Sequence, residues 1–133
     1  MAEQRNRVAD PVFNAAEAVR MYRGAAAQGT AVVAFPELGL SAYTCDDLFH
    51  QATLLERCLD ALHAVAPATR GRAAVAIVRL PLRVDPRLFH CPPIVPGRPV
   101  LGVQPHTHLP NYAAFYSGRQ FSGAHAALPT TAL

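Results

Sequence analysis

Two short apolar runs, each preceded by an amphipathic helical pattern, constrain the fold of this chain most strongly. The runs span residues 30–35 and 73–78 and consist of β-branched and small apolar residues without polar alternation. Strands of this kind are typical of sheets that are buried on both faces. The order helix, strand, helix, strand therefore predicts a layered α/β fold.

Apolar residues at helical spacing indicate the two helices. In the first, Asn14 is expected to be the N-cap, with Glu17 in capping-box register, and Gly29 is expected to follow the C-terminus. The second helix is expected to begin at the acidic pair 46–47 and to end near Pro67. The regular part of the fold is thus expected before residue 80.

The sequence beyond Leu80 is rich in proline, since eight of the twelve prolines lie from Pro81 to Pro110. Residues 88–91 and 99–103 could still form strands joined by a turn at residues 96–97. The prolines at 92–93 permit only an edge strand or an interrupted one there, because proline cannot donate to a ladder.

The composition excludes several classes of protein. With 51% hydrophobic and 16% charged residues, the chain is not expected to be disordered. All twelve basic residues are arginines, and they are scattered, so no nucleic-acid partner is expected. No apolar run is long enough for a bilayer, and the polar N-terminus lacks the apolar core of a signal peptide. A cytoplasmic protein without a membrane partner is expected, with three free cysteines.

Glu37 is the most informative polar residue, because it comes directly after Pro36 at the end of the first apolar run. Ligands of open α/β sheets bind at the carboxyl ends of the strands. A carboxylate on a proline-stiffened turn at that edge is well placed to act as a general base. The plainer alternative is a helix cap or a solvated loop residue.

Residues 35–51 also carry a family resemblance. Their sequence, FPELGLSAYTCDDLFHQ, resembles the glutamate motif of the nitrilase (carbon–nitrogen hydrolase) superfamily, and more narrowly the glutaminase domain of bacterial glutamine-dependent NAD synthetases. Three further segments resemble the same family in the same order, namely RVADPVFNAAEAV (7–19), PLRVDPRLFHCPPIVPGRPVLGV (81–103) and LPNYAAFYSGRQF (109–121).

The resemblance implies that residues 1–121 form a partial nitrilase-type α-β-β-α sandwich, about the first half of the domain. An irregular tail is expected over residues 122–133. A half-domain of this type is expected to expose apolar sheet surface, which favours association. A homo-oligomer or a complementing synthetase chain is therefore a possible partner.

The resemblance also implies a chemistry. In the family, a cysteine thiolate attacks the side-chain amide of glutamine, a glutamate is the general base, and a lysine stabilises the developing negative charge. Glu37 matches the general base, and Tyr43 matches a tyrosine of the substrate region. The released ammonia passes to a separate synthetase domain, which would bind ATP and the dinucleotide. No cofactor is expected in this chain.

The sequence departs from the family at the other catalytic positions. His106 occupies the lysine position, the chain has no lysine, and His90 replaces a family asparagine. The family nucleophile belongs further along than Leu133, and none of the cysteines matches it. Without a thiolate no thioester can form. We expect a fragment related to the glutamine-hydrolysing domain and inactive alone, which leaves open whether it is an enzyme. The alternative is one part of a split active amidase whose cysteine half comes from another chain.

Two other sites are weaker hypotheses. The HxH spacing of residues 106–108 could bind a metal, but Pro105 and Pro110 bracket it and indicate a loop, so no metal site is expected. The additional ligands of such a site would be His90, Cys91 and His125. Residues 39–43 nearly match the serine-hydrolase elbow, but the last glycine is absent, so we interpret this match as a false positive.

Overall fold

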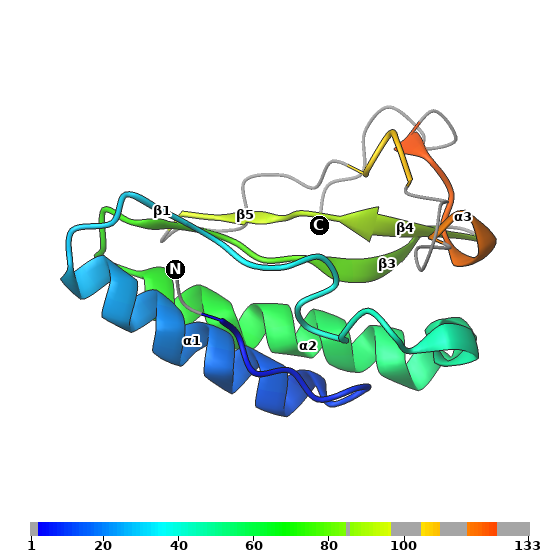
Figure 1. The fold of residues 1–133 in the computed structure, drawn as a ribbon, viewed down its shortest axis with the longest axis horizontal. Coiled ribbons are helices and arrows are strands. Elements are labelled where there is room, and N and C mark those ends of the chain that lie inside the picture. The colour runs from blue at the N-terminus through cyan, green and yellow to red at the C-terminus, as the bar shows by residue number, and fades with distance from the viewer. Residues whose placement is uncertain (1–2, 85, 97–104, 110–116, 125–133) are drawn as a thin grey trace.

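The structure, a computed structural model, describes residues 3–84, 86–96, 105–109 and 117–124. Two long helices, α1 (Pro11–Ala27) and α2 (Ala52–Thr69), lie side by side against one side of the strands (Figure 1). The predicted α/β fold is confirmed. The strands are β1 (Val32–Ala34), β2 (Val75–Ile77), β3 (Leu80–Val84), β4 (Arg87–Cys91) and β5 (Ile94–Val95).

The strands form two small sheets. In the first, β1 pairs with β2 in parallel, with Val32 opposite Val75, and β2 pairs with β5 in antiparallel orientation. In the second, β3 and β4 form an antiparallel hairpin with Leu80 opposite Cys91. The predicted strand at residues 88–91 is confirmed as part of β4. In the structure β4 pairs with β3. The strand that the sequence analysis proposed as the partner of residues 88–91, at residues 99–103, lies outside the described residues.

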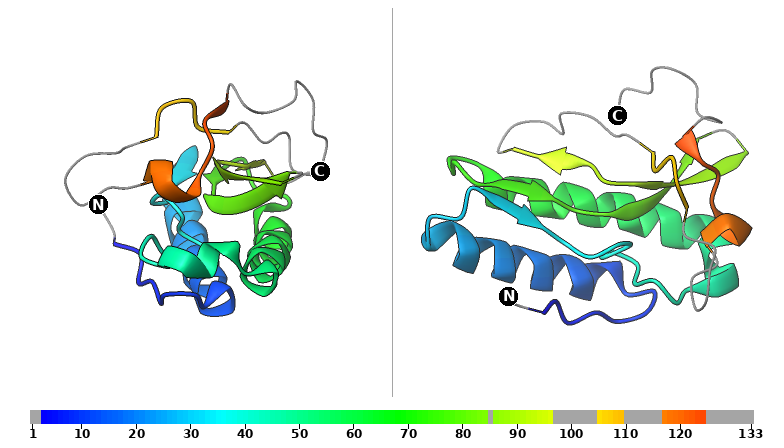
Figure 2. Two further views of the ribbon diagram at one scale, coloured as in Figure 1. Left: turned by 90° about the vertical axis from the view of Figure 1, so that its right-hand side faces the viewer. Right: turned by 45° about the horizontal axis from the view of Figure 1, so that its top comes forward.

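The prediction that the first strand is buried on both faces is wrong. Residues one apart in a strand face opposite sides of the sheet, and only Val33 of β1 packs against the core beneath it. Val32 on the opposite face is 54% exposed, and Ile94 of β5 is 41% exposed. Among the described residues, both long helices cover the same face of this sheet (Figures 1 and 2). The other face therefore carries exposed apolar side chains, as expected for a partial sandwich.

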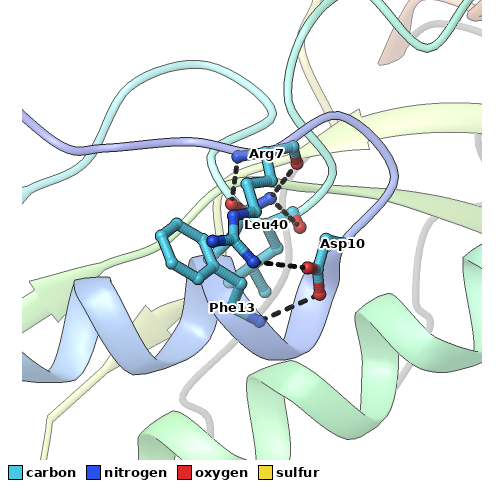
Figure 3. A network of polar contacts seen from close by, with 5 residues as sticks. Arg7, Asp10, Phe13 and Leu40 are labelled. Atoms are coloured by element: carbon cyan, nitrogen blue, oxygen red, sulfur yellow. Dashed lines mark hydrogen bonds and ion pairs between the residues drawn. The ribbon is translucent and has the colours of Figure 1, made fainter.

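The N-terminus of α1 differs from the sequence-based prediction. Asp10 is the N-cap, and its carboxylate accepts a hydrogen bond of 3.1 Å from the backbone N–H of Phe13 (Figure 3). Pro11 occupies the first helical position, where its missing N–H costs nothing. The predicted capping box of Asn14 and Glu17 does not form, because Asn14 lies inside the helix and is completely buried.

Asn14 instead joins three segments of the chain. Its amide oxygen accepts a hydrogen bond of 2.7 Å from the backbone N–H of Arg7, and its amide nitrogen donates to the carbonyl oxygens of Arg7 and Leu40. Figure 3 shows Arg7 and Leu40 meeting above the first turn of α1. A fully satisfied buried amide fixes the N-terminal segment against the turn that contains Leu40.

The C-terminus of α1 agrees with the prediction. Gly29 follows the helix with a φ of 80°, and its N–H donates to the carbonyl oxygen of Ala26. The N–H of Thr30 donates to the carbonyl oxygen of Ala25, which completes a Schellman motif. The chain is thereby turned from α1 into β1.

The second helix begins later than predicted. The acidic pair opens a short 3₁₀ helix, η1 (Asp46–His50), and Gln51 is extended before α2 starts at Ala52. The positive φ of Asp46, 47°, prevents a continuous α-helix from beginning there. Pro67 is tolerated inside the last turn of α2, two residues before its end.

Aromatic rings join the last described segment to η1. The short helix α3 (Ser117–Gln120) lies beside η1 (Figure 2), and the rings of Phe49 and Phe121 pack edge to face at 5.1 Å. The described part of the chain contains no helix long and apolar enough to cross a membrane. The predicted tail begins at Ser122, whose N–H donates to the carbonyl oxygen of Leu88. Residues 125–133 of that tail lie outside the described residues.

Candidate functional site

Glu37 lies on a tight turn at the carboxyl end of β1. The side chains of Phe35, Leu38 and Leu40 around it are buried and anchor the turn in the core. The N–H of Gly39 donates to the carbonyl oxygen of Pro36 at 3.2 Å. A side chain at position 39 would place its Cβ 3.1 Å from that oxygen, which is why glycine suits this turn. The side chain of Glu37 is 35% exposed and is held on a turn that is anchored in the core.

Arg79 is the cation beside Glu37, and it follows β2 as Glu37 follows β1. Its Nη1 lies 3.3 Å from Oε1 of Glu37, and its carbonyl oxygen accepts a hydrogen bond from the N–H of Leu40. Its buried Nε has no partner among the described residues. The sequence analysis did not identify Arg79 as a site residue. A signal existed, however, because the carboxyl ends of neighbouring parallel strands meet at one edge of a sheet.

His90 and His106 form the other side of the site. Their rings stack at 4.5 Å with an angle of 7° between the ring planes, and the backbone N–H of His106 donates to the carbonyl oxygen of His90. His90 lies on β4 and is 1% exposed, and its Nε2 has no hydrogen-bond partner in the described structure. One ligand atom from each of Glu37, His90 and His106 lies within 4.8 Å of the other two. The structure thus brings together both residues predicted to be catalytic.

Both imidazoles are neutral at neutral pH. Burial, the neighbouring His106 and the Arg79 guanidinium lower the pKa of His90 to about 3. Burial and Arg79 also lower the pKa of His106, against the opposing effect of Glu37. At the position where the resemblance implies a lysine, the chain therefore presents a neutral ring.

Tyr43, the predicted substrate-binding residue, is half-buried. Its hydroxyl lies 2.8 Å from Oγ of Ser117 at the start of α3, and either group could be the donor. This contact ties the segment after the Glu37 turn to α3. Its role toward a substrate stays a prediction.

The three cysteines are free and buried. Burial raises the pKa of Cys45, and it raises the pKa values of Cys58 and Cys91 to about 12. Cys91 packs with Leu82 and Phe89, in a cluster separate from the main core. No cysteine belongs to the Glu37 group in the described part of the chain. These thiols are protonated and lie in apolar surroundings, which is typical of structural rather than nucleophilic cysteines.

Ser41, the centre of the elbow-like match, is also structural. It is completely buried, and its Oγ, which carries a single proton, lies within hydrogen-bonding distance of the carbonyl oxygens of Leu38, at 3.2 Å, and Ala42, at 3.0 Å. These bonds stabilise the turn that carries Glu37. The interpretation of this match as a false positive agrees with the geometry.

Comparison with known proteins identifies sequence relatives of one kind. No protein-family model matches the chain. The glutamine-dependent NAD(+) synthetase of Mycobacterium leprae is 36% identical over 115 residues, which are 86% of this chain. The chain spans only 17% of the length of that relative.

Solved structures share the fold. The glutamine-dependent NAD+ synthetase of Acinetobacter baumannii, in complex with ADP, matches with a TM-score of 0.84 and 22% identity, covering 100% of this chain and 25% of that one. The amidase of Nesterenkonia sp. AN1, from the nitrilase superfamily, matches with a TM-score of 0.76 and 19% identity, covering 91% and 47%. In a structure of a mutant of that amidase, acrylamide has undergone Michael addition at the active-site cysteine.

Proposed function

We propose that this chain, a sequence relative of glutamine-dependent NAD(+) synthetases with the fold of nitrilase-superfamily amidases, carries the general base of a glutamine-hydrolysing domain and is inactive by itself. One observation carries the proposal: Glu37 stands on a rigid turn at the carboxyl edge of a parallel strand pair, while no reactive sulfur lies beside it in the described structure. Residues 1–121 would form the partial hydrolase domain.

Glu37 is suited to accept a proton. Amide cleavage through a thioester needs a base that takes the proton of the attacking thiol and returns it to the leaving ammonia. The partly exposed carboxylate can exchange protons with solvent, and the buried residues on both sides of it fix its position. A neighbouring cation or N–H donor would stabilise the oxygen that becomes negative.

The groups around Glu37 are a poor substitute for a lysine. His106 is neutral and can donate only one N–H, and Arg79 is already engaged with Glu37. Loss of a preorganised donor to the developing negative charge costs roughly 10²–10³ in rate. The absent thiolate is the larger defect, because it removes the covalent step itself.

A split amidase is the second candidate. The exposed Val32 and Ile94, on the sheet face that neither long helix covers, favour it, since a second polypeptide could bury them. That partner would supply the cysteine, and ammonia would pass to a synthetase domain that binds ATP and the dinucleotide. The same face would serve a homo-oligomer.

Ammonia release from glutamine tests the proposal. We expect the purified chain and its Glu37→Gln variant to match a protein-free blank. In a second arm, the wild-type chain and the variant are each mixed with a synthetase from M. leprae that lacks the segment matching this chain. Ammonia release by the mixture that contains the wild-type chain, and not by the mixture that contains the variant, would establish the split amidase with Glu37 as base. Glutamine hydrolysis by the isolated chain, with one of its cysteines acylated in the mass spectrum, would overturn the proposal.

A further inference from the structure

We propose that Glu37, His90 and His106 form a binding site for a divalent transition metal of the zinc type. The three side chains come from the β1 turn, from β4 and from the segment at residues 105–109. Their ligand atoms lie within 4.8 Å of one another. Two imidazoles and one carboxylate are a ligand set that zinc uses where it keeps an open fourth position.

The orphaned nitrogen of His90 is the second observation that points to a ligand. Buried polar side-chain atoms are nearly always hydrogen-bonded, and an exception requires an explanation. His90 is 1% exposed, and its Nε2 has no partner among the described residues. A ring nitrogen that carries no proton and accepts no hydrogen bond has a free lone pair, and this is the form of histidine that binds a metal. An ion shared with His106 would satisfy it.

The site must close slightly to hold an ion. Bond lengths of about 2.0–2.2 Å in a tetrahedral zinc site place neighbouring ligand atoms about 3.3–3.6 Å apart. The two rings are nearly parallel, at 7°, so their in-plane lone pairs do not yet converge on one point. His90 is fixed on a strand and completely packed, whereas His106 is half-buried in a non-helical segment. His106 is therefore the ligand that turns out of the stack.

Arg79 competes with the metal for Glu37. Its guanidinium lies 3.3 Å from one carboxylate oxygen in a pair that is about a third exposed. A partly exposed ion pair of this kind is a weak competitor. A bound ion would also occupy the carboxylate that amide cleavage requires. Metal binding is therefore a property separate from the proposed function, and it does not depend on that function.

The ligand set differs from the one weighed from the sequence. His108, two residues from His106, is exposed and is not part of the group, and neither is Cys91. His125 lies outside the described residues. Sequence spacing indicated an HxH pair, whereas the fold selects only one of its two histidines and adds Glu37.

Metal binding by the untagged chain tests the proposal without reference to activity. The chain is stripped with a chelator, dialysed against Zn²⁺ and assayed for metal content, and Co²⁺ is then titrated while the visible absorption of its complex is recorded. We expect one Zn²⁺ per chain and a tetrahedral Co²⁺ spectrum. His106→Asn and Glu37→Gln should each weaken binding by at least about tenfold, since even residues that only orient metal ligands cost 10–100-fold.

His108→Asn is the matched control for His106→Asn, because it removes an exposed histidine from the same segment. It should bind Zn²⁺ and Co²⁺ as the wild type does, and circular dichroism of all variants confirms their folding. The proposal is overturned if the wild-type chain retains no stoichiometric Zn²⁺. It is equally overturned if His108→Asn loses as much affinity as His106→Asn, or if Glu37→Gln binds as tightly as the wild type.

Discussion

The two sides of the site are built in different ways. On the charged side, Glu37 and Arg79 each follow a strand of the parallel pair and meet at 3.3 Å at its carboxyl edge. On the histidine side, His90 comes from the β3–β4 hairpin and His106 from a segment joined to it by a backbone hydrogen bond. One side is partly exposed and pairs a carboxylate with a guanidinium, and the other is largely buried and consists of two neutral imidazoles.

The difference shows which part of a site local sequence determines. Residues that follow neighbouring parallel strands must meet, because the strands end at the same edge. The contact between His90 and His106 has no such rule behind it, since it depends on how a proline-rich segment returns to the hairpin. The two sides should therefore respond to different perturbations. Loss of packing and added salt should affect the charged side, whereas acid should affect the histidine side.

The largest effect is expected from the core beneath the charged side. Leu40 is completely buried below the turn that carries Glu37. Leu40→Ala should lower the free energy of unfolding by about 2–5 kcal/mol, through lost burial and the cavity it leaves. Urea denaturation followed by circular dichroism measures this. Leu48→Ala, at a position that is 36% exposed, should cost less than about 1 kcal/mol. Equal losses in the two variants would show that the turn is not anchored through Leu40.

Acid should lower the free energy of unfolding through the histidine side, by less than Leu40→Ala does and by more than loss of the Glu37–Arg79 pair does. The pKa of His90 is lowered to about 3 in the folded chain, mainly by burial, against about 6.5 when unfolded. The unfolded chain therefore binds the proton first, so this contribution to stability is complete above about pH 6.5 and is lost as the pH falls toward 3. The expected loss between pH 6.5 and 5 is about 1–2 kcal/mol.

His90→Asn separates this effect from the titration of carboxylates. Urea denaturation at pH 6.5, 5.5 and 5, with a chelator present, should give the variant a flatter dependence of unfolding free energy on pH than the wild type. Asparagine is polar but does not titrate in this range, so the difference between the two slopes belongs to the histidine. Identical slopes would mean that His90 is already charged, or solvated, in the folded chain.

Local patterns predicted the elements more successfully than their boundaries. Gly29 ends α1 as expected, because a residue with positive φ is a local requirement that glycine meets best. Asn14 was placed wrongly because its buried bonds to Arg7 and Leu40 are tertiary and outweigh its preference for a cap. The burial of β1 was wrong because the strand pattern describes a sheet covered on both faces, and the described helices cover only one of them.

The same distinction applies to the site. Glu37 could be chosen from the sequence because its strand, proline and turn are contiguous. His106 was found through the resemblance, and the structure places it near Glu37. Arg79 follows the second strand of the same pair, so its position was a usable signal, but it was missed because it was considered only as one arginine among twelve. The orphaned Nε2 of His90 could not be foreseen, since burial without a partner is a property of the packed hairpin.

The smallest effect is expected from the ion pair that defines the charged side. A double-mutant cycle of Glu37→Gln and Arg79→Gln should give a coupling energy of about 0.2–1 kcal/mol, because the pair is about a third exposed and solvent screens it. The coupling should decrease when the salt concentration is raised from about 0.1 M to 1 M, where the Debye length falls from about 10 to 3 Å. The i,i+3 pair of Glu17 and Arg20 on α1 is the control, and its coupling should be no larger than that of Glu37 and Arg79 and should decrease with salt in the same way. A Glu37–Arg79 coupling well above 1 kcal/mol that ignores salt would place this pair in a desolvated environment. The contrast between an exposed charged side and a buried histidine side would then be wrong.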